Sequence, residues 1–373
     1  MNNLPVFFIS SSTLESWDWT NPWTKGIGGS ETSHIELVER LRRRGFSTMS
    51  YAPVTWDDYR EGPAKVSWTT YKNLPEIKPE GIYIWYRAPE KLDGEKPKGS
   101  KYYFVAQDVD YPDLWTEERL AKVDRYICLC HEHALYTLGR YPSLRGRVYT
   151  SSNGIRSEYI RNMPKLKDRD PDRMFFPSSP DRGLKLLLEQ WWRIRECNSD
   201  ASLYVAYGFN NMKVIADANP SDWRNEYQAH LESMLDQPGV HVLGRLPQDA
   251  LYKEWFKTGI WAHPTDFPET SCITCMEAQA CGAFPVTNDL WALKDNVGHG
   301  WMVQGVPQKS ELVRHNWLRS LQLAFETLNV GFIEREHKEM QEWALDRFDW
   351  ERIADQWQRW LEKDMEALNA SVR

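Results

Sequence analysis

The sequence predicts an α/β protein of two Rossmann-like domains, each built on a parallel sheet. Short apolar runs alternate with amphipathic helical patterns along the chain, which is typical of βαβ units. The chain has 373 residues, enough for two domains that each bury a core. A charged, proline-bearing stretch over residues 163–173 separates the halves and predicts a linker.

In the first half, a strand is predicted over residues 5–10 and an amphipathic helix over residues 31–44. The loop between them contains Gly28 and Gly29. These glycines either let the backbone approach a phosphate or form a tight turn that needs a positive φ. Further strands are predicted over residues 48–52, 81–85, 102–106, 125–129 and 148–150.

In the second half, a short strand leads into the turn Ser178–Lys185, and Gly183 opens a helix. The tail over residues 341–368 has helical patterns rich in tryptophan. In open parallel sheets, ligands bind beyond the carboxyl ends of the strands, which is where Gly28-Gly29 and Gln107-Asp108 of the first half would lie. Strands are predicted over residues 202–207, 240–243, 259–262 and 284–287.

Two carboxylates, Glu269 and Glu277, lie eight positions apart across a loop that enters a helix ending at Gly282. If the whole interval were helical, they would be about 12 Å apart along the axis and roughly 80° apart around it. That span is about the length of a sugar, a diphosphate and a ribose laid end to end. The helix N-terminus between them would offer N–H groups to phosphates.

This segment resembles the E-x7-E motif of retaining GT-B glycosyltransferases, in particular the large GT4-type family. Four further segments resemble landmarks of that family and occur in the same order along the chain. They are the glycine-rich turn Gly28-Gly29-Ser30-Glu31, the Asn-Gly-Ile of Ser152-Asn153-Gly154-Ile155, the S-P-D-R-G-L entry at Ser178–Lys185, and Val242-Leu243-Gly244-Arg245-Leu246.

The resemblance implies a GT-B fold, with two Rossmann-like domains facing a central cleft. We expect an acceptor domain over residues 1–162 and a nucleotide-sugar donor domain over residues 170–345. The last helix, about residues 349–373, is expected to cross back to the first domain.

The resemblance also implies roles for three residues. Glu277 would bind the ribose of the nucleotide, and Glu269 would contact the donor sugar beside the reacting carbon. Arg182 would bind the diphosphate and offset the charge that develops on it. The ordinary alternatives are an exposed helix glutamate for Glu277 and, for Glu269, a charge that complements the helix dipole.

The sequence departs from the family pattern at two places. The family usually has another arginine six positions before Arg182, where this chain has Phe176. Ser178, Ser179 or Lys185 could supply part of the missing contacts, although Lys185 could equally be a solvated helix residue. Relatives often have a histidine where this chain has Gln107, and Asp108 is expected to take its catalytic role. Asp108-Val109-Asp110 mimics a D-x-D metal motif, which we interpret as coincidence.

The remaining donor contacts are expected from backbone groups that follow Glu269 and from the segment that reads the nucleobase. Tyr207 or Phe209 could line the base pocket, with packing in the core as the alternative. The expected donor-binding residues are Glu277, Gly28, Gly29, Ser179, Lys185, Arg245, Leu246, Thr270, Ser271, Cys272 and Ile273.

Composition narrows the class of protein. The net charge of −7 disfavours general nucleic-acid binding. The six cysteines form no secreted framework, and Cys272-x-x-Cys275 has no second ligand pair nearby, so no metal is expected. No apolar run reaches about 18 residues, and we expect the N-terminal residues to form a strand and not a signal peptide. We expect a cytoplasmic protein, with peripheral membrane contact allowed by local basic runs and by the resemblance.

We therefore expect a retaining, metal-independent glycosyltransferase that needs no cofactor. Its co-substrate would be a nucleoside diphosphate sugar, and a UDP- or GDP-sugar is the leading expectation. Its acceptor would be a hydroxyl group of a glycan, of a lipid-linked molecule or of another molecule. Three alternatives stay open: a catalytically silent sugar-nucleotide-binding protein on the same fold, a sugar-nucleotide epimerase, and a glycosyltransferase that acts on modified DNA bases.

Overall fold

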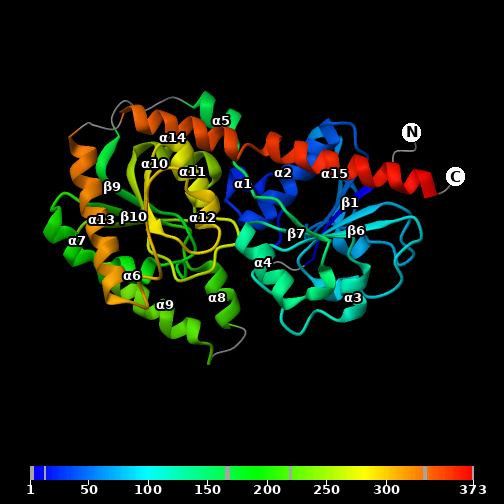
Figure 1. The fold of residues 1–373 in the computed structure, drawn as a ribbon, viewed down its shortest axis with the longest axis horizontal. Helices are drawn as coiled ribbons and strands as arrows, with labels where there is room; N and C mark the ends of the chain where they lie inside the picture. The colour runs from blue at the N-terminus through cyan, green and yellow to red at the C-terminus, as the bar shows by residue number, and fades with distance from the viewer. Residues whose placement is uncertain (1–3, 12–13, 164–168, 218–220, 331–333, 372–373) are drawn as a thin grey trace. The chain divides into compact units, whose positions relative to one another are not determined.

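The computed structural model describes residues 4–11, 14–163, 169–217, 221–330 and 334–371. The chain divides into two compact units (Figure 1). Unit 1 comprises residues 1–22, 27–154 and 348–373, and unit 2 comprises residues 23–26 and 155–347. Each unit has one predominantly parallel sheet between helices, so the predicted α/β fold class is confirmed.

The sheet of unit 1 has the strand order β3-β4-β2-β1-β5-β6-β7-β8, and only the pair β3–β4 is antiparallel. The short strands β3 and β4 were not predicted from the sequence. The strands are β1 (Val6–Ser10), β2 (Thr48–Ala52), β3 (Arg60–Glu61), β4 (Ser67–Thr70), β5 (Ile82–Tyr86), β6 (Lys101–Val105), β7 (Arg125–Cys128) and β8 (Val148–Thr150).

Alternating side chains of these strands fill two separate cores. Val6 and Phe8 of β1 pack toward helices α2 and α15, whereas Phe7 and Ile9 face the side covered by α3 and α4. The helices of unit 1 are α2 (Gly29–Arg43), α3 (Glu117–Lys122), α4 (His131–Arg140) and α15 (Trp350–Ser371), and the boundary between the units divides α1 (Asn21–Thr24).

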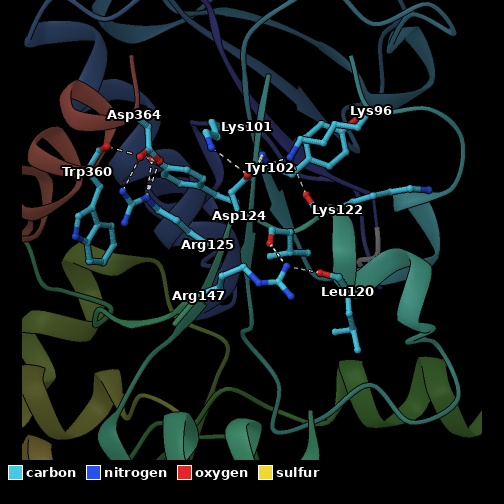
Figure 2. Close-up of polar contacts among 12 residues, drawn as sticks. Lys96, Lys101, Tyr102, Leu120, Lys122, Asp124, Arg125, Arg147, Trp360 and Asp364 are labelled. Carbon is cyan, nitrogen blue, oxygen red and sulfur yellow. Dashed lines mark hydrogen bonds and ion pairs between the residues drawn. The ribbon is translucent and has the colours of Figure 1, made fainter. Parts of the chain in front are cut away.

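Helix α15 packs in unit 1, as predicted, although it ends the chain (Figure 1). It buries Ile353, Trp357 and Leu361 at steps of four residues, which is the apolar stripe of an amphipathic helix. Asp364 then accepts two hydrogen bonds from Arg125, both 2.7 Å long, and one from the Tyr103 hydroxyl at 2.6 Å (Figure 2). This bidentate pair, in which Arg125 is buried and Asp364 half-buried, fixes the helix on the sheet.

The sheet of unit 2 is wholly parallel, with the order β11-β10-β9-β12-β13-β14. Strand order reverses between β9 and β12, so the loops that leave these two strands flank a topological switch point, the usual place for a ligand. The strands are β9 (Asp170–Phe176), β10 (Ser202–Ala206), β11 (Val240–Gly244), β12 (Thr258–His263), β13 (Phe284–Asn288) and β14 (Trp301–Val303).

Helices cover both faces of this sheet. Helices α6, α7 and α13 bury Leu187, Trp191 and Trp317 in the core on one face. On the other face, Trp255 of α10 packs edge-on against Phe175 of β9. The helices are α5 (Ser157–Asn162), α6 (Leu184–Glu189), α7 (Trp191–Cys197), α8 (Asn210–Asp217), α9 (Trp223–Met234), α10 (Gln248–Lys257), α11 (Ile273–Cys281), α12 (Leu293–Asn296), α13 (Glu311–Asn329) and α14 (Glu334–Arg347).

One prediction about the linker is wrong. Residues 170–173 were assigned to it because they are polar, but they begin strand β9, and residues 164–168 lie outside the described part of the chain. Arg173 is buried because its guanidinium lies over the ring of Tyr204, 3.4 Å from the centroid, and pairs with Glu254. A buried, paired arginine in a strand looks like a solvated linker residue in the sequence.

No described helix is both long and apolar enough to cross a bilayer.

Candidate functional site

The two motif carboxylates occupy different local structures. Strand β12 ends at His263, a loop follows, and helix α11 begins only at Ile273, so Glu269 lies in the loop and Glu277 in mid-helix. Cys272 precedes the helix with φ −85° and ψ 87°, and its N–H donates to Asn296 Oδ1 at 2.9 Å. The fully helical spacing worked out from the sequence therefore does not apply.

The loop after β9 lies against the loop after β12, and Gly183 makes this approach possible. Gly183 has a φ of +111°, which disfavours any residue with a side chain. A Cβ atom there would also overlap the backbone carbonyl of Pro264. The Ser178–Lys185 turn and the E-x7-E segment, distant in sequence, thus meet at the switch point of the sheet.

Arg182 and Glu269 form an ion pair at this point, with 3.3 Å between Nη1 and Oε2. The guanidinium of Arg182 also lies over the ring of Phe267, 3.1 Å from its centroid. Burial raises the pKa of the Glu269 carboxyl, but the charge of Arg182 and the contact with His263 outweigh burial and hold that pKa below its ordinary value. Glu269 is therefore a buried carboxylate that stays ionised at neutral pH, beside a cation.

His263 was not singled out from the sequence, yet it completes this cluster. It is fully buried at the end of β12, with Nε2 3.8 Å from Glu269 Oε1. Phe176 stacks on its ring at 5.6 Å between centroids, and Trp261 stacks at 4.6 Å. Phe176, six positions before Arg182, therefore contributes an aromatic ring to this cluster and no charge.

A metal ion could in principle find three ligand atoms here. The ligand atoms of His263, Glu269 and Cys272 all lie within 4.8 Å of one another. The Arg182 cation already pairs with Glu269 and would repel a metal ion. Burial also raises the pKa of the Cys272 thiol, which opposes the thiolate form that metals bind.

Glu277 is 3% exposed, and its Oε1 accepts a hydrogen bond of 2.5 Å from Gln248 Nε2, on the first turn of α10. Burial raises the pKa of its carboxyl to about 7, against the lowering effects of hydrogen bonds from Gln248, Trp255 and Tyr252 and of the Arg156 charge. A buried carboxyl with this pKa is not the exposed helix glutamate of the ordinary alternative. Gln248 was also missed in the sequence, because only the fold places it beside Glu277.

The other residues predicted for the donor site in unit 2 are distributed around this centre. The Ser178 hydroxyl is 3.0 Å from that of Thr274 on α11, and the Ser179 carbonyl accepts the Arg182 N–H in the turn. Thr270 is buried, Ser271 is half-buried, and Ile273 is the first residue of α11. Lys185 faces solvent on α6 and is 3.7 Å from Glu189.

The segment predicted to read the nucleobase connects β11 to α10. Arg245 and Leu246 follow Gly244, and the backbone of Leu246 lies so close to Gly26 that a Cβ atom on that glycine would overlap its carbonyl oxygen. Tyr207 begins the neighbouring loop with a φ of +84°. Phe209 packs against the core of unit 2, in agreement with its alternative role.

Unit 1 contains its own polar cluster at the carboxyl ends of β5 and β6. Arg87, another residue that sequence reasoning missed, is 3.1 Å from Asp108 and 3.8 Å from Glu31. Gln107 and Asn153 lie within 3.4 Å of each other. Asp110 instead accepts a 2.6 Å hydrogen bond from the Tyr141 hydroxyl, so the two carboxylates of the D-x-D sequence have different partners.

Gly28 and Gly29 lie at the start of α2 beside this cluster. Gly28 has a φ of −70°, and Gly29 is the first residue of the helix, so neither supplies the tight turn with positive φ that was one alternative. Gly28 instead gives room to Glu31, whose carboxylate would overlap a Cβ atom at that position. The positive φ in this loop belongs to Gly26, at +73°.

No family model and no curated protein sequence matches this chain. Solved structures do match. A glycosyltransferase from Rickettsia africae is 11% identical with a TM-score of 0.70, over 98% of this chain and 99% of its own. Sucrose-phosphate synthase from Thermosynechococcus elongatus is 14% identical with a TM-score of 0.67, over 98% and 100%. Anabaena HepE, solved with UDP and glucose, is 12% identical with a TM-score of 0.60, over 97% and 100%. At these identities the similarity shows the fold, which is GT-B.

Proposed function

We propose that the protein is a retaining glycosyltransferase that transfers a sugar from a nucleoside diphosphate sugar to an acceptor hydroxyl. The observation that carries the proposal is the meeting of Arg182, Glu269 and His263 at the switch point of unit 2, with Glu277 on the adjoining helix. The GT-B fold it shares with HepE, which was solved with UDP and glucose, supports a nucleotide-sugar donor.

In this proposal the residues of unit 2 position the donor and balance its charge. Glu277 accepts hydrogen bonds from the ribose hydroxyls, and Glu269 accepts them from the sugar. Arg182 exchanges part of its contact with Glu269 for the diphosphate and offsets the negative charge that grows as the glycosyl bond breaks. The departing phosphate takes the proton of the acceptor hydroxyl, so the new bond forms on the face that the diphosphate leaves. A paired general acid and base is then unnecessary.

The test is turnover with a panel of UDP-, GDP-, ADP-, CDP- and dTDP-sugars, with release of the nucleoside diphosphate as the readout. We expect one donor class to be consumed, with and without EDTA, and consumption to fall in the Arg182→Ala variant. The exposed Glu226 supplies a control variant, Glu226→Ala, that should be unaffected. With an acceptor, NMR of the product should show the anomer of the donor; an inverted linkage would refute the retaining mechanism.

A catalytically silent binding protein is the second candidate, because Phe176 packs where the family has a second arginine. Nucleotide binding that depends on Glu277, without turnover of any donor in the panel, would favour it. Binding by none of the nucleotides would refute both candidates.

A further inference from the structure

Gln248 is unusual among polar side chains at helix N-termini, because its amide is directed to a buried group. It is the first residue of α10, directly after Pro247, whose φ of −68° leads the chain into the helix. Its amide does not cap the helix but donates to the buried Glu277 at 2.5 Å. Tyr252 and Trp255, one and two turns further along α10, are buried on the same side. The helix therefore presents one face, beginning with Gln248, toward α11.

The groups that face Glu277 come from three elements. Gln248, Tyr252 and Trp255 approach from α10, Arg156 from the segment before α5, and Cys281 from α11 itself. The Arg156 guanidinium lies over the ring of Trp23, 4.4 Å from its centroid, which holds this cation in place. Burial disfavours the ionised carboxyl, so the hydrogen bond from Gln248 is one of the contacts that keep it available as an acceptor.

An ionised carboxylate offers about four acceptor positions. Gln248 uses one of those on Oε1 and helps to fix the plane of the group, together with hydrogen bonds from Trp255 and Tyr252. A protonated carboxyl would be a poorer partner, because it offers fewer acceptor positions and carries no charge. The orientation and the charge of Glu277 thus both depend on a donor outside the E-x7-E segment.

We propose that Gln248 is a positioning residue that orients Glu277 toward the 2′- and 3′-hydroxyls of the donor ribose, and so makes the site selective for ribonucleotides over 2′-deoxyribonucleotides. The inference rests on the proposed function, in which Glu277 binds the ribose. Gln248, on the first turn of α10, holds the Glu277 carboxylate in its binding orientation before the nucleotide binds. This reduces the reorganisation that binding requires.

The first variant is Gln248→Leu, which has a similar volume and no donor. UDP and GDP are each titrated beside their 2′-deoxy counterparts, by calorimetry, between pH 5.5 and 8.5. The wild type should bind the ribonucleotide about tenfold or more tightly than its 2′-deoxy form, since a hydrogen bond to a charged group contributes about 1.5–3 kcal/mol. Gln248→Leu should lose most of this ratio while changing the affinity of the deoxy form less than about twofold.

The second variant is Gln248→Lys, which keeps a donor and adds a charge. Gln248→Leu should move the pH at which ribonucleotide affinity reaches its half-maximum upward, because a favourable contact of the ionised form is lost. Gln248→Lys should move it downward, because a cation stabilises the ionised form. A merely structural role of Gln248 would not move the profile in opposite directions. Gln248 is half-buried, so both variants are expected to fold.

Two controls separate the possible results. Gln228→Leu removes an amide that donates to the exposed Glu232 and should change nothing. Glu277→Gln tests the carboxylate itself. If Glu277→Gln abolishes the ribose preference and Gln248→Leu retains it with an unmoved profile, this inference is wrong and the proposed function stands. If the wild type has no ribose preference, or Glu277→Gln keeps it, the ribose role of Glu277 fails and the inference fails with it.

Discussion

Replacement of Glu277 by glutamine should stabilise unit 2 at alkaline pH while it weakens nucleotide binding. Burial raises the pKa of this carboxyl from 4.5 to about 7, so the folded protein binds a proton more tightly than the unfolded chain does. Between these two values, the free energy of unfolding falls as pH rises, because the folded state retains a proton that the unfolded state has released. Above pH 7 the buried carboxyl is ionised, and the free energy of unfolding is lowered by the full cost of burying its charge.

The rise of the pKa from 4.5 to about 7 corresponds to about 3.4 kcal/mol when both states are fully ionised, and to slightly less at pH 8. Glutamine has nearly the same shape, can still accept the hydrogen bond from Gln248, and does not titrate. We therefore expect Glu277→Gln and the wild type to differ little at pH 4.5. By pH 8 the variant should be more stable by about 3 kcal/mol.

Hydrogen exchange of peptides from α11, followed in increasing urea, is the appropriate assay because it reports on unit 2 rather than on a mixture of two unfolding units. Glu226→Gln is the matched control, since Glu226 is exposed and should gain nothing. A variant that is no more stable than the wild type at pH 8, or whose advantage is independent of pH, would refute the assignment of Glu277 as a buried, destabilising carboxylate.

Three further predictions concern the neighbouring side chains. Arg182→Ala should lower kcat by about 10²–10³-fold, and because burial then dominates at Glu269, the pH profile of kcat/KM should shift upward. Gly183→Ala should lower the free energy of unfolding by about 2 kcal/mol in urea titrations, because φ at this position is +111°; an unchanged midpoint would contradict the turn described above. Burial lowers the pKa of His34 to about 3, so as pH falls the unfolded chain takes up a proton before the folded protein does. The contribution of His34 to the free energy of unfolding therefore falls below pH 6.5, by about 1.4 kcal/mol per pH unit. His34→Gln should abolish this contribution to the pH dependence between pH 6.5 and 4.5.

Local patterns were sufficient to predict most of the framework. The apolar run of β1 and the three-residue steps of α2 each have a periodicity that survives in the fold. The strands of unit 2 were also found, except β14 (Trp301–Val303). The beginning of β9 was missed because its arginine, Arg173, is paired through tertiary contacts that no local pattern reveals.

The residues of the candidate site likewise fall into two groups, those found from local motifs and those that only tertiary contacts reveal. Arg182 and Glu269 were chosen from motifs, and the structure brings them within 3.3 Å of each other, although their roles in transfer remain a proposal. His263 and Gln248 were missed because neither belongs to a motif. The pairing of β12 with β9 places His263 in the cluster, and the packing of α10 beside α11 places Gln248 beside Glu277.

The most direct test of the account is nucleotide binding measured through thermal unfolding with UDP, GDP, ADP, CDP and dTDP, with and without EDTA. A nucleotide at about 100 times its dissociation constant adds about 2.7 kcal/mol to the stability, which raises the melting temperature by several degrees. We predict one clear shift that survives EDTA and is lost in Glu277→Ala. A shift of equal size in the wild type and Glu277→Ala, or no shift with any nucleotide, would contradict the central claim that unit 2 binds a nucleotide through Glu277.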